Sequence, residues 1–156
     1  MKKQIFIIVM SFLVGGCMSS GTLGGFDNRT FSTSKSMLNK ALDTFYFRYP
    51  KYKIPDKWQD RDNWAQRGYG FLESRIFYFN EHPEEMYYVS FIGDSTMLAD
   101  PDKISIAIRA VYKGGKNWMM ESEFDKQETE RIETRFDKEI INRLESYTQV
   151  KAQREH

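Results

Sequence analysis

Cysteine is almost absent from this sequence of 156 residues, which contains only one, Cys17. A single cysteine excludes a disulfide bond within the chain, and the glycine-rich surroundings of Cys17 argue against a buried core position. The folded part must therefore rely on its hydrophobic core, for which 12 Phe, 9 Tyr and 3 Trp supply large apolar surfaces.

Neither sign of charge is in excess. The chain carries 23 Lys and Arg against 22 Asp and Glu, so its formal net charge at pH 7 is +1. Domains that bind nucleic acid usually gather a basic excess on one face. We therefore expect no nucleic-acid partner.

Catalytic and metal-binding signatures are missing as well. The two histidines, His82 and His156, have no ligand or base at a useful spacing, and the sequence contains no G-x-S-x-G elbow. The stretch KGGK at residues 113–116 lacks the spacing of a phosphate-binding loop and fits a two-residue hairpin turn. We expect a protein that is not an enzyme and that carries no metal, cofactor or catalytic residue.

Three acidic residues, Asp56, Asp60 and Asp62, come nearest to a reactive cluster. Alternating acids could bind calcium, or a pair of them could serve a glycosidase, but their spacing is not that of an EF-hand loop. Lys57 and Arg61 stand beside them, so a solvated surface with salt bridges is the favoured interpretation.

The clearest motif lies at the N-terminus. Two lysines precede an apolar run at residues 5–14, which is shorter than the roughly 20 residues that a transmembrane helix needs. A cationic head, a short apolar run and then small residues are typical of a secretory signal peptide. The stretch Val14-Gly15-Gly16-Cys17 that follows resembles the lipobox of bacterial lipoproteins.

The resemblance implies that residues 1–16 are a removed signal peptide and that Cys17 carries a diacylglycerol, often with a further acyl chain such as palmitate on its amine. Two or three acyl chains anchor a protein far more firmly than one, because each buried CH₂ contributes about 0.8 kcal/mol. Met18, in place of an aspartate, implies the outer membrane. We expect the domain to lie in the periplasm, held to the membrane by its lipid.

Residues 17–33 are rich in Gly, Ser and Thr, so we expect the lipidated cysteine to be followed by a flexible tether. The alternative is a strand near residues 26–31. A single domain is expected at 34–150, with a frayed tail at 151–156.

Periodic apolar residues predict two helices, at residues 34–49 and 125–150. The β-rich stretches between them predict four strands, at residues 71–80, 86–93, 104–113 and 117–123. The order α-β-β-β-β-α with short connections predicts an α+β fold, in which both helices pack on one face of an antiparallel sheet. Along the third strand, Ile106, Ile108 and Ala110 should face the helices, and Arg109 should face water.

The long connection at residues 50–70 is irregular and rich in aromatic side chains. Such side chains can anchor a protein partner, and the possible partner-binding residues are Tyr52, Trp58, Trp64 and Tyr69. The alternative, which we favour, is a lid over an open part of the core, because a small neutral domain must bury its large side chains.

A short lipidated chain with an α+β domain and no catalytic residues resembles the accessory lipoproteins of envelope machines. The small lipopolysaccharide-transport lipoproteins are similar in element order, which is an analogy of fold alone. The resemblance implies a binding or assembly module whose partner is a protein or another envelope component. A membrane-anchored inhibitor or immunity protein and a weak hydrolase that uses the loop carboxylates are the alternatives.

Overall fold

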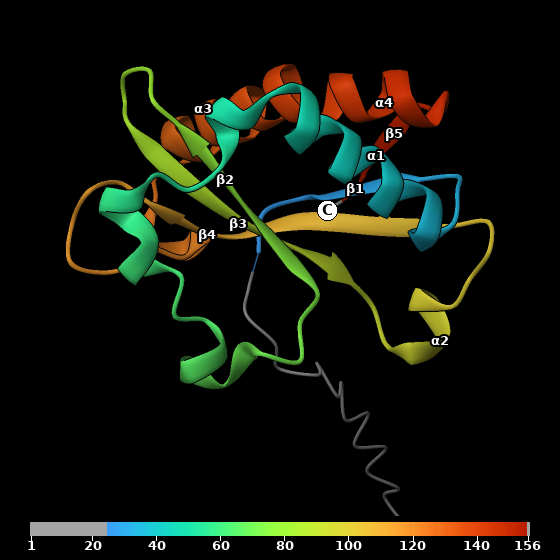
Figure 1. The fold of residues 1–156 in the computed structure, drawn as a ribbon, viewed down its shortest axis with the longest axis horizontal. Coiled ribbons are helices and arrows are strands. Elements are labelled where there is room, and N and C mark those ends of the chain that lie inside the picture. The colour runs from blue at the N-terminus through green and yellow to red at the C-terminus, as the bar shows by residue number, and fades with distance from the viewer. Residues whose placement is uncertain (1–24, 156) are drawn as a thin grey trace, which may run out of the picture.

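The computed structural model describes residues 25–155, which form a five-stranded antiparallel sheet with helices packed against it (Figure 1). The predicted α+β class is therefore confirmed. Cys17, the lipobox and the first part of the predicted tether lie outside the described residues.

The sheet combines strands from both ends of the described chain. Its strands are β1 (Asn28–Phe31), β2 (Ser74–Phe79), β3 (Glu85–Ile92), β4 (Ile104–Tyr112) and β5 (Ala152–Glu155), and a short helix, α2 (Ser95–Leu98), lies between β3 and β4. The strand order is β2-β3-β4-β1-β5, and all neighbouring pairs are antiparallel. β2 and β5 therefore form the two edges.

The first long helix is confirmed close to its predicted limits. α1 (Lys35–Arg48) begins after Ser34, whose hydroxyl accepts a hydrogen bond from the N–H of Met37 at 3.3 Å. The helix ends ahead of Pro50, as expected because a residue before proline avoids helical geometry.

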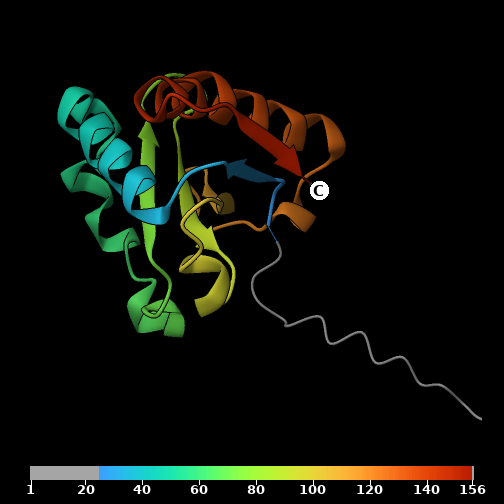
Figure 2. The ribbon, with the colours of Figure 1, turned by 90° about the vertical axis from the view of Figure 1, so that its right-hand side faces the viewer.

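The C-terminal helix is also confirmed. It consists of α3 (Lys126–Phe136), a π-helical turn (Asp137–Ile141) and α4 (Asn142–Thr148), which follow one another without a gap. Asp125 caps its start by accepting a hydrogen bond from the N–H of Glu128 at 2.8 Å. Figure 2 shows this helix lying across one side of the strands.

The main core lies between these helices and the sheet. Its fully buried helical side chains are Leu38, Phe45, Ile132, Phe136, Ile140 and Leu144. Ile106 and Ile108 of β4 face them, as predicted. Burying a side chain of this size stabilises the fold by about 1.5–3 kcal/mol, so this layer supplies much of the stability.

A β-bulge interrupts the alternation of β4. Tyr88 pairs with Ala110 and Val89 pairs with Ile108, so Arg109 has no residue opposite it. The extra residue turns Ala110 away from the helices and onto the second face of the sheet, where it is buried. The prediction that Ala110 faces the helices is therefore wrong.

Part of the predicted tether is a strand. β1 pairs with β4, with Arg29 opposite Ile106, and Phe26 and Phe31 are buried in the main core. The burial of two phenylalanine rings offsets the entropy lost by ordering this segment. The flexible tether predicted to residue 33 is therefore wrong for residues 25–33, and the alternative strand is correct.

The predicted frayed tail is a strand as well. β5 adds to β1, with Arg154 opposite Arg29, and Glu145 of α4 fixes its start by accepting the N–H of Ala152 at 3.0 Å. This strand is only partly buried, so backbone hydrogen bonds and ion pairs hold it in place, and its polar sequence carries no apolar pattern.

The predicted fourth strand at residues 117–123 is not formed. A single bridge joins Met119 to β4, and a 3₁₀ turn (Glu121–Glu123) follows it. Trp118 turns instead onto the second face of the sheet and is buried there, with its ring centre 5.7 Å from that of Tyr112. The burial of this large ring thus stabilises the observed conformation more than continued strand pairing would.

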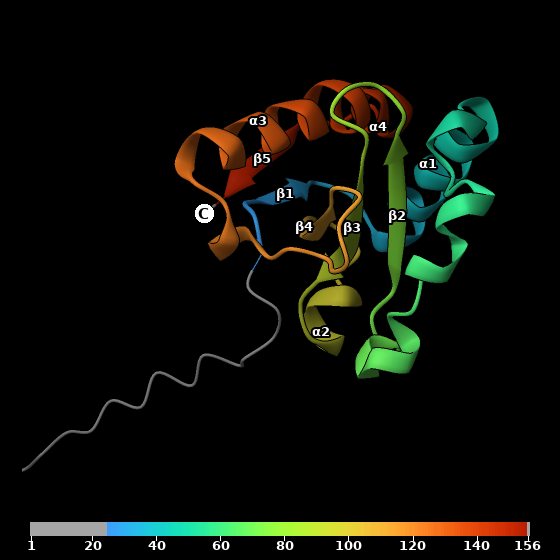
Figure 3. The ribbon, with the colours of Figure 1, turned by 90° about the vertical axis from the view of Figure 1, so that its left-hand side faces the viewer.

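The second face of the sheet is covered by the connection at residues 50–72 from Ile54 onward and by the loop that carries Trp118, whereas Tyr52 packs in the main core. The segment is not plain coil, because it contains three short helical turns, Pro50–Tyr52, Asp56–Arg61 and Ala65–Tyr69. Figure 3 shows it passing beside β2 and ending below that strand. The sheet is therefore packed on both faces.

Both packed layers are built from side chains between residues 26 and 152, so this part of the chain holds its own core. Among residues 25–155, no helix is long and apolar enough to cross a bilayer.

Candidate functional site

Tyr52 and Trp64, two of the four predicted partner-binding residues, are buried. Their exposed fractions are 2% and 3%. Tyr52 lies in the main core, and its hydroxyl donates to Glu139 at 2.8 Å. Trp64 stacks on Tyr88 of β3, with ring centres 3.9 Å apart. A partner cannot reach these rings in the folded protein. Trp64 therefore acts as part of a lid over the second face of the sheet, and Tyr52 as part of the main core.

Trp58 and Tyr69 are only partly buried in the same layer. The ring of Trp58 meets that of Tyr112 with centres 4.9 Å apart, and the ring of Tyr69 meets that of Trp64 at 5.7 Å. Each ring therefore has one side committed to packing. Contact of Trp58 and Tyr69 with a partner stays a prediction.

An ionic cluster joins β1, β5 and α3. Buried Arg29 donates to Asp137 at 2.5 and 2.9 Å, and one of its nitrogens lies 3.9 Å from an oxygen of Glu133. Arg154 of β5 pairs with Glu133 and, at 2.6 Å, with Asp27. A hollow of about 370 Å³ lies beside the cluster. Because its charged groups bind one another across three elements, the cluster holds the fold together.

A second ionic cluster joins β3 to α3. Glu85 is buried, and its carboxylate accepts hydrogen bonds from Arg131 at 2.8 and 3.0 Å and from Arg135 at 2.9 Å. Hydrogen bonds from Arg131 and Lys113, against the opposing effect of burial, hold the pKa of Glu128 at about 2. These carboxylates are committed to salt bridges and are not free for acid–base chemistry.

The loop carboxylates Asp56, Asp60 and Asp62 are exposed. Asp60 forms a salt bridge with Arg61 at 3.5 Å, and such an exposed pair contributes less than about 1 kcal/mol. Between residues 25 and 155, no group of three or more His, Cys, Asp or Glu side chains is arranged to hold a metal ion.

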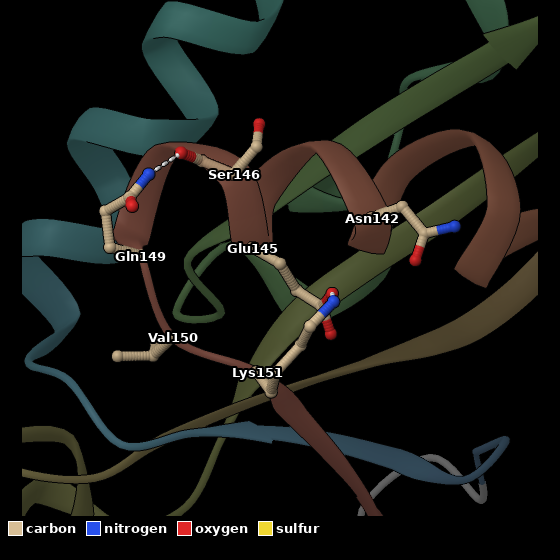
Figure 4. A pocket seen from close by; sticks show the side chains of 6 residues that line it. All are labelled: Asn142, Glu145, Ser146, Gln149, Val150 and Lys151. Carbon is tan, nitrogen blue, oxygen red and sulfur yellow. Dashed lines mark hydrogen bonds and ion pairs between the residues drawn. The ribbon is translucent and has the colours of Figure 1, made fainter.

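A hollow of about 280 Å³ lies where α4 turns into β5 (Figure 4). Glu145 and Lys151 point toward each other there and form an ion pair at 2.5 Å. The side-chain amide of Gln149 donates to the carbonyl of Ser146 at 2.5 Å. These contacts hold the turn that leads into β5. The polar side chains that line this hollow therefore serve the fold.

A wider groove of about 500 Å³ follows the edge strand β2. Tyr46, Ile54, Ser74 and Ile76 contribute to its lining. The hydroxyl of Tyr46 donates to the carbonyl of Ile76 at 2.7 Å, so part of the free edge is already occupied by the protein's own side chain. Although β2 is an edge strand, only part of its edge is therefore open at this groove.

A smaller cavity, which we call the Arg109 cavity, lies between the end of the 50–72 segment, β3 and α2. Its volume is about 160 Å³, and its lining includes Phe71, Leu72, Leu98, Ser90 and Arg109. An apolar cavity of about 150 Å³ can take up a molecule as large as benzene. The Arg109 cavity therefore has room for one small chemical group, with an apolar wall and three polar side chains, those of Glu73, Ser90 and Arg109.

Arg109 is held at this cavity by the bulge in β4. It forms no hydrogen bond or ion pair with any of residues 25–155, and its buried Nε has no acceptor. Burial lowers the pKa of Arg109, because desolvation disfavours the charged form. The hydroxyl of Ser90, also buried, has no partner in this part of the chain either. Folded proteins satisfy about 90% or more of their buried polar groups, so two such groups on one cavity are unusual.

The acidic groups near the cavity do not neutralise Arg109. The carboxylate of Glu73 is bound by Lys35 at 2.7 Å and by the amide of Asn39 at 2.5 Å. Asp94 caps α2, since its carboxylate accepts the N–H groups of Thr96 and Met97, each at 2.9 Å. Arg109 therefore lines the cavity without an ion pair to any carboxylate of residues 25–155.

The sequence reasoning missed this site, because it placed Arg109 on a regular strand facing water. The bulge leaves no clear mark in the sequence. A usable signal was nevertheless present, since Arg109 is the one charged residue in the run ISIAIRAVY at residues 104–112, where the neighbouring side chains are buried. A lone charge inside a fully buried strand calls for a partner.

Comparison with known proteins adds no assignment, because no family model, no curated protein and no solved structure matches the chain.

Proposed function

We propose that this protein is a lipid-anchored, non-enzymatic binding module of the bacterial envelope. Cys17 holds it at the outer membrane, and its periplasmic domain serves as an accessory that binds a protein or another envelope component. The lipobox at Val14-Gly15-Gly16-Cys17 supports the anchor, and the Arg109 cavity supports the binding role.

The guanidinium of Arg109, beside an apolar wall and without an ion pair to residues 25–155, is the observation that carries the binding role. A guanidinium offers five N–H donors in a fixed fork that matches carboxylate and phosphate oxygens. Phe71 and Leu72 would pack against an apolar part of the same ligand. The cavity therefore suits an anionic group carried on an apolar or amphipathic molecule.

The lining also supports a binding role over catalysis. Ser90 is the hydroxyl of the cavity, and a serine needs an adjacent base to become a nucleophile. Its oxygen has no hydrogen-bond partner among the described residues, so no base activates it.

The anchor is tested by Cys17→Ser, which removes the acyl acceptor. Cells that express either form are labelled with a radioactive fatty acid, and their membranes are separated by density. We expect label on the unaltered protein and none on the variant. Label on the Cys17→Ser protein, or its continued association with lipid, would contradict the anchor.

The binding role is tested by photo-crosslinking in living cells. A photoreactive amino acid is placed at Phe71, beside the cavity, or at Phe47, an exposed phenylalanine on α1. We expect an adduct from position 71 that is lost when Arg109→Met is added. An adduct that is unchanged by Arg109→Met, or that forms equally from position 47, would contradict the cavity as the binding site.

A further inference from the structure

We infer that the face that carries the Arg109 cavity rests on the membrane surface and that the cavity receives the phosphate of a phospholipid. This inference rests on the proposed lipid anchor and extends it, because it assigns an orientation to the domain and a chemical class to the ligand.

The point where the chain enters the domain supports this orientation. Gly25 passes so close to Arg109 that a Cβ atom on it would lie 3.2 Å from Nη1 of Arg109 and 3.0 Å from the carbonyl oxygen of Ile108. The N–H of Phe26 donates to that same carbonyl at 3.1 Å. Figure 1 shows this start of the coloured chain below β1, on the other side of that strand from α1 and the C-terminal helix. The chain thus enters the described domain next to Arg109.

The length of the tether limits how far the domain can turn. Residues 18–24 join Cys17 to Gly25, and a stretch of this length spans at most roughly 29 Å. A domain of this size has a radius of gyration of about 14 Å, which for a sphere corresponds to a diameter of about 36 Å, so its far side lies beyond the full reach of this segment. The face next to Gly25 is therefore the one that the anchor brings to the bilayer.

Exposed apolar side chains border the cavity on this face. Phe71 lines the cavity and is 73% exposed, and Met97 of α2 is 54% exposed. Met97 packs on Gly93, another lining residue, where a Cβ atom would lie 2.6 Å from the Cβ of Met97. Large apolar side chains that stand out beside a basic group are typical of surfaces that enter the headgroup region of a membrane.

Charge complementarity favours a phosphate as the occupant. Arg109 lines the cavity without an ion pair to residues 25–155, Glu73 of the same lining is paired with Lys35, and Asp94 accepts the N–H groups at the start of α2. A phospholipid supplies phosphate oxygens to Arg109 and acyl chains to Phe71 and Met97 at the same time. Free phosphate would satisfy Arg109 alone, so the exposed apolar rim favours the lipid.

The orientation is tested with the lipidated full-length protein in vesicles of phosphatidylethanolamine and phosphatidylglycerol. Lipidation blocks Cys17, so Phe71→Cys and Phe47→Cys each introduce one free thiol, which is labelled with a fluorophore. Phe47 is the matched control, since it is 85% exposed but lies on α1 over the other face. We expect spin-labelled headgroups to quench the label at position 71 strongly and the label at position 47 weakly. Equal quenching, or stronger quenching at 47, would overturn the inference.

The ligand is tested by adding Arg109→Met to the labelled Phe71→Cys protein and by using vesicles of a neutral glycolipid without phosphate. The quenching should fall in both cases, and for Arg109→Met the equilibrium between the surface-bound and the lifted domain, read from the degree of quenching, should shift about fivefold toward the lifted state, the effect of one arginine near an anionic membrane. A separate arm titrates inorganic phosphate and follows the Nε–H signal of Arg109 by nuclear magnetic resonance. If inorganic phosphate saturates that signal while quenching is the same with both lipids, the cavity is a free-phosphate site and the lipid assignment is wrong.

Failure of this inference can be told apart from failure of the proposed function. A protein without acylation would show two free thiols in each Phe71→Cys chain, and this would contradict the anchor itself. A fully acylated protein whose position 71 stays unquenched would leave the anchor in place and contradict only the orientation.

Discussion

The two faces of the sheet are packed by different means. Under α1 and the C-terminal helix, regular elements interlock mostly aliphatic and phenylalanine side chains. On the other face, an irregular segment and a loop supply Trp64 and Trp118, which pack on tyrosines of β3 and β4. Buried polar atoms that have no partner among residues 25–155 collect on this second face, among them Nε1 of Trp64 and the cavity groups of Ser90 and Arg109. The second face is therefore the less completely satisfied of the two, and the proposed binding site lies on it.

The largest expected effect concerns the lid over the second face. Trp64→Ala should lower the free energy of unfolding by about 3–5 kcal/mol, because it empties the space of a buried ring stacked on Tyr88. Trp58→Ala should cost clearly less, since Trp58 is only partly buried. Urea unfolding of residues 25–156 measures both. A small effect of Trp64→Ala would show that the second face contributes little to stability.

The next effect concerns the face under the helices. Ile106→Ala should cost about 2–5 kcal/mol, because Ile106 is fully enclosed by α1 and the C-terminal helix. Ser105→Ala on the same strand is the control, and its side chain points to the opposite side. Similar losses for the two variants in urea unfolding would mean that the strand register is misassigned.

A gain in stability is expected at the candidate site. Arg109→Met keeps the length of the side chain and removes a partly buried guanidinium whose Nε has no acceptor among residues 25–155, and a buried donor without an acceptor commonly costs about 1–3 kcal/mol. The melting temperature of the domain should therefore rise while vesicle binding falls. A lower melting temperature would indicate that Arg109 stabilises the fold. The contrast drawn between the two faces of the sheet would then not hold at this residue.

The smallest effect is a dependence on pH at the helix side. The pKa of Glu128 is about 2 in the folded protein, below the value of about 4.3 for an unfolded glutamate. Its contribution is therefore fully present above about pH 4.3 and is lost as the pH falls toward 2. The contribution should be less than about 1 kcal/mol, because the carboxylate is partly exposed. Glu128→Gln should remove this part of the acid sensitivity in melting curves between pH 5 and pH 2.

The three tryptophans make the comparison of faces measurable. Trp58, Trp64 and Trp118 all belong to the second face, so tryptophan fluorescence follows that face, whereas circular dichroism follows the helices. In an acid titration, coincident transitions would show that the two faces unfold as one unit. An earlier change in circular dichroism would show that the ionic contacts of α3 loosen first.

The helical face could be predicted from the sequence because its elements are regular. The periodicity of α1 and of the C-terminal helix, and the alternation at Ile106 and Ile108, follow directly from burial on one side. The strands at both ends could not be predicted in the same way. β1 gains its burial from Phe26 and Phe31 within a Gly- and Thr-rich stretch, and β5 is a polar strand whose partners are more than 100 residues away in the chain.

The candidate site could be predicted only in part. The sequence identified the aromatic segment 50–70 and the possibility of a lid, and Trp64 confirms that possibility. It could not place Arg109 at a cavity, because a bulge depends on how two strands are paired and not on the residues of one strand. Sites built on such irregularities need the three-dimensional register before they can be found.

The pairing of β1 with β5 also sets the order of events during biosynthesis. The hydroxyl of Thr30 donates to Glu155 at 3.0 Å, across 125 positions of the chain. β1 therefore cannot gain both of its neighbours until nearly the whole domain has been synthesised, and contacts at such long separation form slowly. During that delay one edge of β1 stays without its strand partner, and the ion pairs that Arg154 forms with Asp27 and Glu133 are not yet made. The last four residues of the described chain thus complete the sheet, so their loss would leave a finished domain with an open edge at β1.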